Sequence, residues 1–159
     1  MMKNSKEVLE LGSSPGGWTQ IVLNYNPNIK ITCFDILEMK LNNHNITFYK
    51  QDFLNYDFNN FNQKFDLVLS DVAPNTTGHQ STDHLKISQL IYDIMEKLKI
   101  ILKYDGSFIF KIWKGREEKE IVKRLKIDFN KVEYFKPKSS RQESSEIFII
   151  SRGFKLNED

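Results

Sequence analysis

The stretch LELGSSPGGW, residues 9–18, places Gly12, Gly16 and Gly17 directly after a short apolar run. Glycine lets the backbone approach a ligand closely or take a positive φ, so such a loop is typical of a ligand site at the carboxyl end of a sheet. The dinucleotide fingerprint G-x-G-x-x-G requires a third-position glycine, where this chain has Ser14. This departure makes a nicotinamide dinucleotide a less favoured ligand.

Two aspartates follow the next predicted strands. Asp35 ends the run KITCFD, and Asp52 comes just after residues 46–51. A carboxylate at the end of the second strand accepts hydrogen bonds from ribose hydroxyls in nucleotide-binding folds, and Asp52 is placed to reach the exocyclic amine of an adenine. Each has an alternative interpretation, because an aspartate after a strand is often only a turn or cap residue.

Lys111 ends the apolar run SFIF within a predicted strand. Lysine is rarely buried, so its side chain either extends along its apolar stem to solvent or is retained for a function. The sequence pattern alone leaves both interpretations open.

Short β-rich runs alternate with helical stretches, which is typical of an α/β fold with helices on both faces of a parallel sheet. The predicted strands are residues 7–11, 30–35, 46–51, 65–70, 106–112, 131–135 and 146–152. Helices are predicted to begin near Trp18, Thr82 and Arg116. The second helix is the clearest, because its apolar residues recur every three to four positions and residues 103–106 supply a stop.

Composition sets the remaining expectations. A chain of 159 residues with 40% hydrophobic content forms one core, so we expect a single domain over residues 1–159. The net charge of +2 identifies no partner. Cys33 is the only cysteine, and no apolar run approaches the roughly 20 residues that span a bilayer. We predict a cytoplasmic protein without a membrane anchor, and no metal, since His79 and His84 lack an accompanying ligand pattern.

Four ordered motifs resemble those of the FtsJ/RrmJ-like RNA ribose 2'-O-methyltransferases: ELGSSPGGW, SDVAPNTTG, GSFIFKIWKG and KPKSSRQESSEIFII. The resemblance runs from about Glu7 to the end of the chain. It implies a Rossmann-like S-adenosylmethionine (SAM) methyltransferase fold, with a seven-stranded, mostly parallel sheet whose seventh strand is antiparallel. It also implies a SAM site that comprises Gly12, Gly16, Gly17, Trp18, Asp35, Asp52 and Asp71.

The same family carries a Lys-Asp-Lys-Glu tetrad, three members of which match Asp71, Lys111 and Glu146 as catalytic residues. Methyl transfer to a ribose hydroxyl is an in-line displacement, so these groups would position the oxygen and receive its proton. Carboxylate neighbours favour the ammonium form of Lys111, whereas desolvation and the sulfonium favour the neutral amine, so its part in proton transfer stays open. Residues 1–6 do not match the helical segment that carries the first lysine, so we expect the domain to lack that segment.

The resemblance also implies an RNA substrate. Lys114, Lys138, Ser140 and Arg141 are the predicted RNA-binding residues. Cations on loops and strand ends beside the cofactor cleft would hold phosphates, and Ser140 and Arg141 belong to the matching family motif. The predicted function is 2'-O-methylation of ribosomal RNA within the large ribosomal subunit by a monomer. The alternatives are tRNA or an mRNA cap as substrate, a non-catalytic RNA-binding or ribosome-assembly module, and an oxidoreductase, which Ser14 disfavours.

Overall fold

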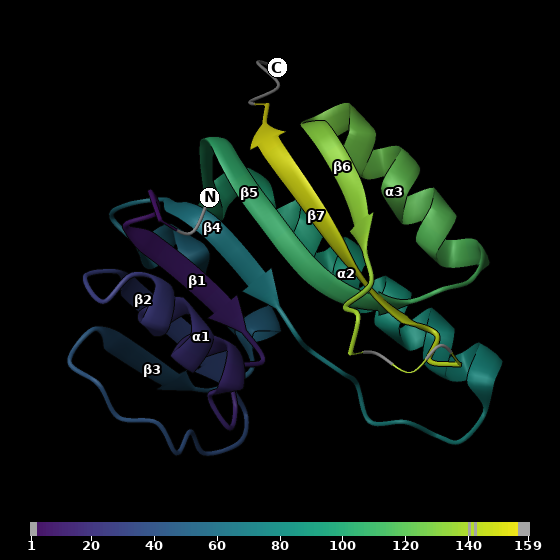
Figure 1. Cartoon of the computed structure of the whole chain (residues 1–159), viewed down its shortest axis with the longest axis horizontal. Coiled ribbons are helices and arrows are strands. Elements are labelled where there is room, and N and C mark those ends of the chain that lie inside the picture. Colours follow the sequence, from purple (N-terminus) through teal and green to yellow (C-terminus); the bar gives the residue numbers. More distant parts are fainter. Residues whose placement is uncertain (1–2, 140, 142, 156–159) are drawn as a thin grey trace.

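A single sheet forms the centre of the computed structural model, which describes residues 3–139, 141 and 143–155. The strands are β1 (Glu7–Leu11), β2 (Lys30–Asp35), β3 (Ile46–Lys50), β4 (Phe65–Ser70), β5 (Leu102–Trp113), β6 (Phe129–Phe135) and β7 (Glu146–Phe154). Their order is β3-β2-β1-β4-β5-β7-β6 (Figure 1), and β7 alone runs in the direction opposite to the other strands. The predicted seven-stranded, mostly parallel sheet with an antiparallel seventh strand is confirmed.

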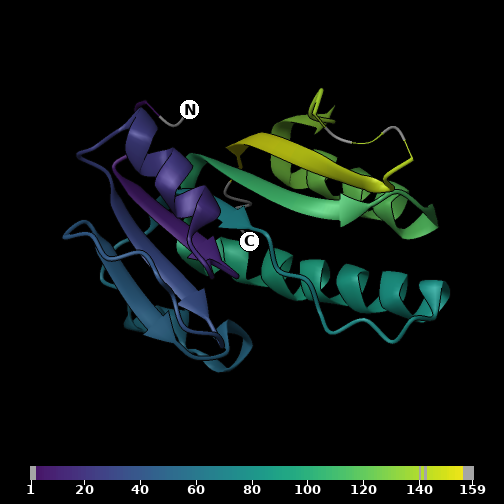
Figure 2. The same cartoon turned by 60° about the horizontal axis from the view of Figure 1, so that its bottom comes forward.

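Helices cover both faces of this sheet. On one face lies α1 (Gly17–Tyr25), and on the other lie α2 (Gln80–Ile101) and α3 (Arg116–Asp128), as Figures 1 and 2 show. Alternating residues of β1 explain the layers, since Val8 belongs to the core cluster that contains Val22 of α1, whereas Leu9 belongs to the cluster that contains Ile91 of α2. Two short 3-10 helices, η1 (Phe53–Asn55) and η2 (Phe58–Asn60), follow β3. None of the helices in the described residues is long and apolar enough to cross a membrane.

The second helix ends before its predicted stop at residues 103–106, but the next strand begins earlier than the predicted residue 106. The helix ends at Ile101 and β5 begins at the next residue, so these residues lie within the strand. They form a bulge, because Phe65 pairs with Leu102 while Leu67 pairs with Ser107. Asp105 takes a φ of 61°, a left-handed conformation that aspartate tolerates better than most residues. The turn-forming residues therefore form a bulge inside β5, and the strand continues beyond them.

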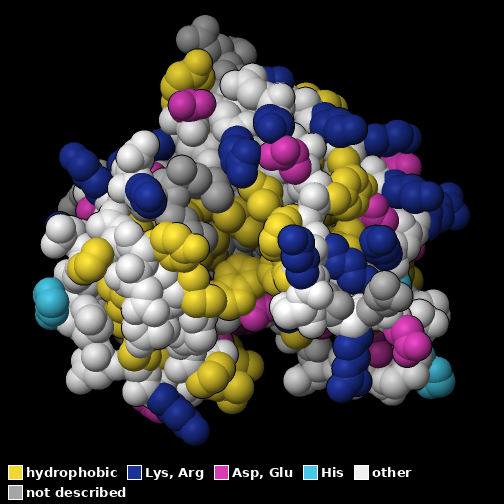
Figure 3. All heavy atoms as spheres, viewed as in Figure 1, with side chains coloured by type: hydrophobic (Ala, Val, Ile, Leu, Met, Phe, Trp, Pro, Cys, Tyr) yellow, Lys and Arg dark blue, Asp and Glu magenta, His cyan; other side chains and the backbone are white. Residues whose placement is uncertain are grey.

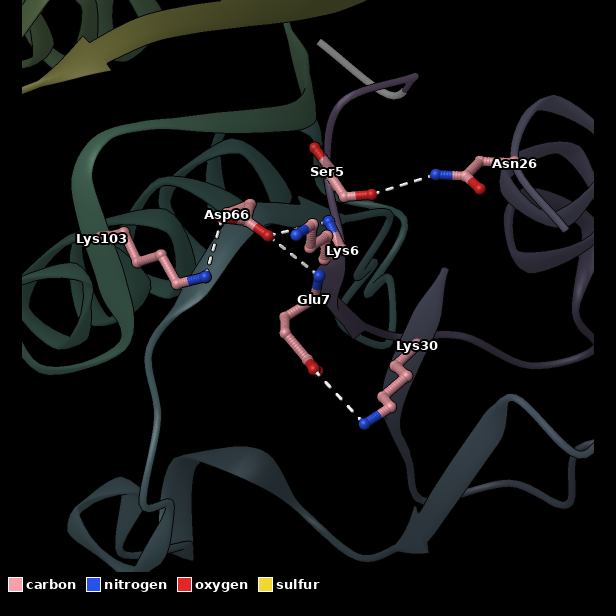
Figure 4. A network of polar contacts seen from close by, with 7 residues as sticks. All are labelled: Ser5, Lys6, Glu7, Asn26, Lys30, Asp66 and Lys103. Atoms are coloured by element: carbon pink, nitrogen blue, oxygen red, sulfur yellow. Dashed lines mark hydrogen bonds and ion pairs between the residues drawn. The ribbon is translucent and has the colours of Figure 1, made fainter. Parts of the chain in front are cut away.

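Polar contacts fasten the chain at the amino ends of the central strands (Figure 4). The carboxylate of Asp66 accepts hydrogen bonds from the backbone N–H groups of Lys6 and Glu7, at 2.8 and 2.9 Å, and from Nζ of Lys103 at 2.8 Å. One partly buried aspartate thus joins the segment before β1 to β4 and to the bulge of β5. The candidate site lies at the opposite, carboxyl edge of the sheet.

Candidate active site

The loop between β1 and α1 is shaped by its glycines. Gly12 has a φ of +75°, and a Cβ added there would lie 2.9 Å from Cγ2 of Val72. Gly16 has a φ of +121°, and its added Cβ would lie 2.9 Å from Cβ of Leu41. A Cβ on Gly17 would meet nothing within 4 Å, so the loop has an open side where α1 begins. The loop therefore excludes side chains at its first two glycines and leaves space for a ligand at the third.

Asp35 joins this loop to the end of β2. Its Oδ2 accepts a hydrogen bond from the backbone N–H of Ser14, and its Oδ1 accepts one from the N–H of Leu37, both at 2.8 Å. Each carboxylate oxygen keeps a further lone pair for a ligand hydroxyl. Asp35 is thus placed both to position the glycine loop and to bind a ribose at the same edge.

Asp52 has a local role. Its Oδ1 accepts a hydrogen bond from the backbone N–H of Leu54 at 2.9 Å and caps η1. The cap interpretation is therefore confirmed for this residue. The side chain is exposed beyond the end of β3, and its contact with an adenine stays a prediction.

The three predicted catalytic residues come together at the carboxyl edge. Asp71 directly follows β4, Lys111 lies near the end of β5, and Glu146 opens β7. Nζ of Lys111 lies 2.5 Å from Oδ1 of Asp71 and 3.8 Å from Oε1 of Glu146. The Lys111 side chain is only 22% exposed, so it ends between two carboxylates and does not extend into solvent. This arrangement holds a cation where a hydroxyl could be oriented and deprotonated.

An apolar hollow of about 320 Å³ adjoins this cluster on the same face of the sheet, between α1 and β7 (Figure 3). Leu69, Ile109 and Phe148 line it, and each is two residues along its strand from a member of the catalytic group. Trp18 also lines it, with its ring centroid 5.5 Å from that of Phe148. The Trp18 ring therefore packs toward β7, and its part in binding SAM stays a prediction.

The described members of the predicted RNA-binding set, Lys114, Lys138 and Arg141, lie at the same edge. The backbone N–H of Lys114 donates to the carbonyl of Ser145 at 2.8 Å, so the end of β5 meets the segment before β7. Lys114, Lys138 and Arg141 are exposed, whereas Ser140 lies outside the described residues. Figure 3 shows Lys and Arg side chains gathered over the part of the molecule formed by β6 and β7. Their contacts with RNA stay predictions.

Within the described ranges, no group of three or more His, Cys, Asp or Glu side chains is arranged to hold a metal ion. His84 packs its ring against Trp113, with 5.2 Å between the ring centroids. This contact gives both aromatic side chains a packing role beside the site.

Two buried carboxylates escaped the sequence analysis. Glu10 is 1% exposed and accepts a hydrogen bond from Oγ1 of Thr19 at 2.5 Å. Its signal was an acidic residue inside the apolar run VLEL. Asp83 accepts hydrogen bonds from the N–H and Oγ1 of Thr77, at 2.7 and 2.8 Å, and from the N–H of Gly78 at 3.2 Å. It thereby fastens the loop that leads from β4 to α2.

Known proteins share both the sequence and the fold. The model of the FtsJ-like methyltransferase family matches residues 1–154. The "Ribosomal RNA large subunit methyltransferase E" of Wolbachia pipientis wMel is 36% identical over 97% of this chain and 81% of that protein. The protein of the same name from Brachyspira hyodysenteriae is 38% identical over 97% and 81%.

Among solved structures, a ribosomal RNA methyltransferase from Plasmodium falciparum superposes with a TM-score of 0.82 at 26% identity, over 97% of this chain and 89% of that chain. The fibrillarin/Nop5p complex contains a chain with the same fold, with a TM-score of 0.72 at 17% identity over 94% and 73%. The family match spans nearly the whole chain and includes all four motifs and the three clustered residues. This chain belongs to the FtsJ-like methyltransferase family.

Proposed function

We propose that this chain transfers the methyl group of SAM to the 2'-hydroxyl of a ribose in large-subunit ribosomal RNA. Family membership makes it a SAM-dependent RNA methyltransferase, and the names of its relatives support the ribosomal substrate. The observation that carries the proposal is the placement of Lys111 between Asp71 and Glu146, next to the glycine loop. A ribosomal substrate places the enzyme in the cytoplasm, and we propose that one chain acts as a monomer.

The shape of the glycine loop fits the cofactor. Gly12 and Gly16 let the backbone turn beneath a ligand, and the open side at Gly17 leaves room for it. The carboxylate of Asp35 accepts hydrogen bonds from the ribose hydroxyls of the cofactor. When bound, SAM supplies an electrophilic methyl carbon on a positively charged sulfur. The chain has to hold a ribose oxygen in line with that carbon and to remove the hydroxyl proton as the new bond forms.

Lys111 performs both tasks in this proposal. Its ammonium orients the ribose oxygen by a hydrogen bond and stabilises the negative charge that develops on it. A charged lysine accepts no further proton, but Asp71 lies 2.5 Å from Nζ and can take one. As Lys111 passes a proton to Asp71, it receives the hydroxyl proton in return, while Glu146 holds the ammonium from the other side. The relay therefore never requires a free neutral lysine.

Replacing Lys111 tests this assignment. We expect Lys111→Ala to lower methyl transfer by about 10² to 10⁴, the range for general acid–base groups, while the Kd for SAM stays within about threefold. Transfer is measured with labelled SAM and ribosomal RNA, and methylation of the ribose oxygen is read from resistance of that linkage to alkali. Lys123→Ala, on the exposed face of α3, is the matched control and should keep full activity.

Full transfer by Lys111→Ala would refute its catalytic role. If the unaltered chain binds both RNA and SAM without transferring a methyl group, the non-catalytic RNA-binding or assembly alternative replaces the proposal. Transfer to tRNA or to capped mRNA in place of ribosomal RNA would replace the proposed substrate and leave the proposed reaction unchanged.

A further inference from the structure

Glu10 lies in β1, the strand that leads into the glycine loop of the proposed cofactor site. It belongs to β1, which lies between β2 and β4 in the sheet, and these two neighbours end at Asp35 and immediately before Asp71. The N–H of Asp71 donates to the carbonyl of Leu11 at 3.2 Å, so this aspartate sits beside the end of β1. Glu10 is two residues before Gly12. A molecule held by the glycine loop, Asp35 and Asp71 therefore lies over the strand that carries Glu10.

The Glu10 side chain is 1% exposed, and this burial opposes its negative charge. From α1, the Thr19 hydroxyl donates to Oε2, and from β2, Sγ of Cys33 lies 4.0 Å away from the same oxygen. The pKa of Glu10 is raised from 4.5 to about 7, because burial and, to a smaller extent, the charges of Asp71 and Asp35 raise it by more than the Thr19 hydrogen bond lowers it. Glu10 is therefore partly protonated near neutral pH, and any cation added nearby favours its ionised form.

We propose that Glu10 distinguishes SAM from its product, S-adenosylhomocysteine, by sensing the positive charge on the sulfur. The inference rests on the proposed cofactor site. The two molecules differ by one methyl group and one positive charge. Glu10 therefore releases its proton to solvent when SAM binds and keeps it when the neutral thioether binds.

The coupling acts in both directions, because binding equilibria are reciprocal. An ionised Glu10 strengthens the binding of the sulfonium and leaves the thioether almost unaffected. Methyl transfer removes the sulfur charge, so the product loses this attraction at the moment it forms. Glu10 thereby favours exchange of product for fresh SAM without touching the reacting atoms, which makes it a specificity-determining residue and not a catalytic one.

The test compares binding of the two molecules to Glu10→Gln and to the unaltered chain. In the unaltered chain, the ratio of the product Kd to the SAM Kd should rise up to about tenfold per pH unit below pH 7, and level off above it. In Glu10→Gln the ratio should be lower and vary with pH only as the ligands themselves do. Glutamine keeps an oxygen for the Thr19 hydroxyl, and Glu7→Gln, at the other end of the same strand, is the control that should match the unaltered chain.

Calorimetry supplies a readout that a purely structural role of Glu10 would not change. Titrations in two buffers of different ionisation enthalpy should detect proton release with SAM and less with the product, and the difference should vanish in Glu10→Gln. Equal proton release for both molecules in the unaltered chain would overturn the inference while leaving the proposed function intact. Failure of the chain to bind either molecule would overturn the cofactor site itself, and the inference with it.

Discussion

At the scale of single residues, the buried Glu10 lowers the free energy of unfolding of the protein without cofactor. Its folded pKa of about 7 lies above the ordinary value of 4.5, so the folded state binds more protons between these values. The free energy of unfolding therefore falls as the pH rises from about 4.5 to about 7, and the full penalty, of order 3 kcal/mol, remains above that range.

We predict that Glu10→Gln removes this pH dependence. The variant should be more stable than the unaltered chain near pH 8, by up to about 3 kcal/mol, and the difference should shrink near pH 5. Urea denaturation at both pH values measures it. A variant that is less stable than the unaltered chain at both pH values would show that Glu10 contributes packing and hydrogen bonding more than it costs in desolvation.

The residues that the sequence did and did not reveal differ in a physical way. Lys111 stands out because a cation is unusual in an apolar strand, and the structure places it between Asp71 and Glu146 as the resemblance implied. Asp35 and Asp52 are alike in sequence, since each follows a strand, yet one fastens the glycine loop and the other caps η1. Hydrogen-bond partners distant in sequence separate these roles, and no local pattern contains them.

At the scale of elements, the Asp66 network decides how firmly the first strand is held. Burial raises the pKa of Asp66, but the hydrogen bonds from Lys103, Glu7 and Lys6 outweigh it and hold the pKa below the ordinary value of 3.8. The stabilisation is therefore present at neutral pH and is lost only when the pH falls through that lowered value.

Asp66→Ala should destabilise the chain by about 2 kcal/mol, because two backbone N–H groups and one ammonium lose their acceptor together. Chemical denaturation at neutral pH measures the loss. Glu120→Ala, which removes an exposed ion pair on α3, is the control and should change stability by less than about 0.5 kcal/mol. A loss for Asp66→Ala as small as that of the control would contradict the structural role of the network.

The bounds of helices and strands were predictable where a run of apolar residues ends at polar residues. Strands β1, β2 and β4 have the predicted bounds, and the helices begin close to the predicted residues. The bulge of β5 was not predictable, because turn-forming residues indicate only the local backbone conformation. They do not reveal that Lys103 donates a hydrogen bond to Asp66 on the neighbouring strand β4. Sequence patterns locate where the chain bends, and tertiary contacts decide whether the strand continues.

At the scale of the whole molecule, topology brings the site together. The carboxyl ends of the parallel strands and the amino end of the antiparallel β7 share one edge, so Asp71, Lys111 and Glu146 meet although the chain separates them widely. The same edge carries Lys114, Lys138 and Arg141 at the surface. Cations at such an edge would contact phosphates, so RNA binding should weaken as the salt concentration rises. No stretch of sequence shows this convergence until the strand order is known.

The central claim is that this chain methylates a ribose of large-subunit ribosomal RNA. It is tested most directly by incubating the chain with labelled SAM and large ribosomal subunits that lack the modification, beside free ribosomal RNA and fully methylated subunits. We predict incorporation of label into an alkali-resistant linkage of the unmodified subunits and none into the methylated ones. Absence of label from every RNA, under conditions where the chain demonstrably binds SAM, would contradict the claim.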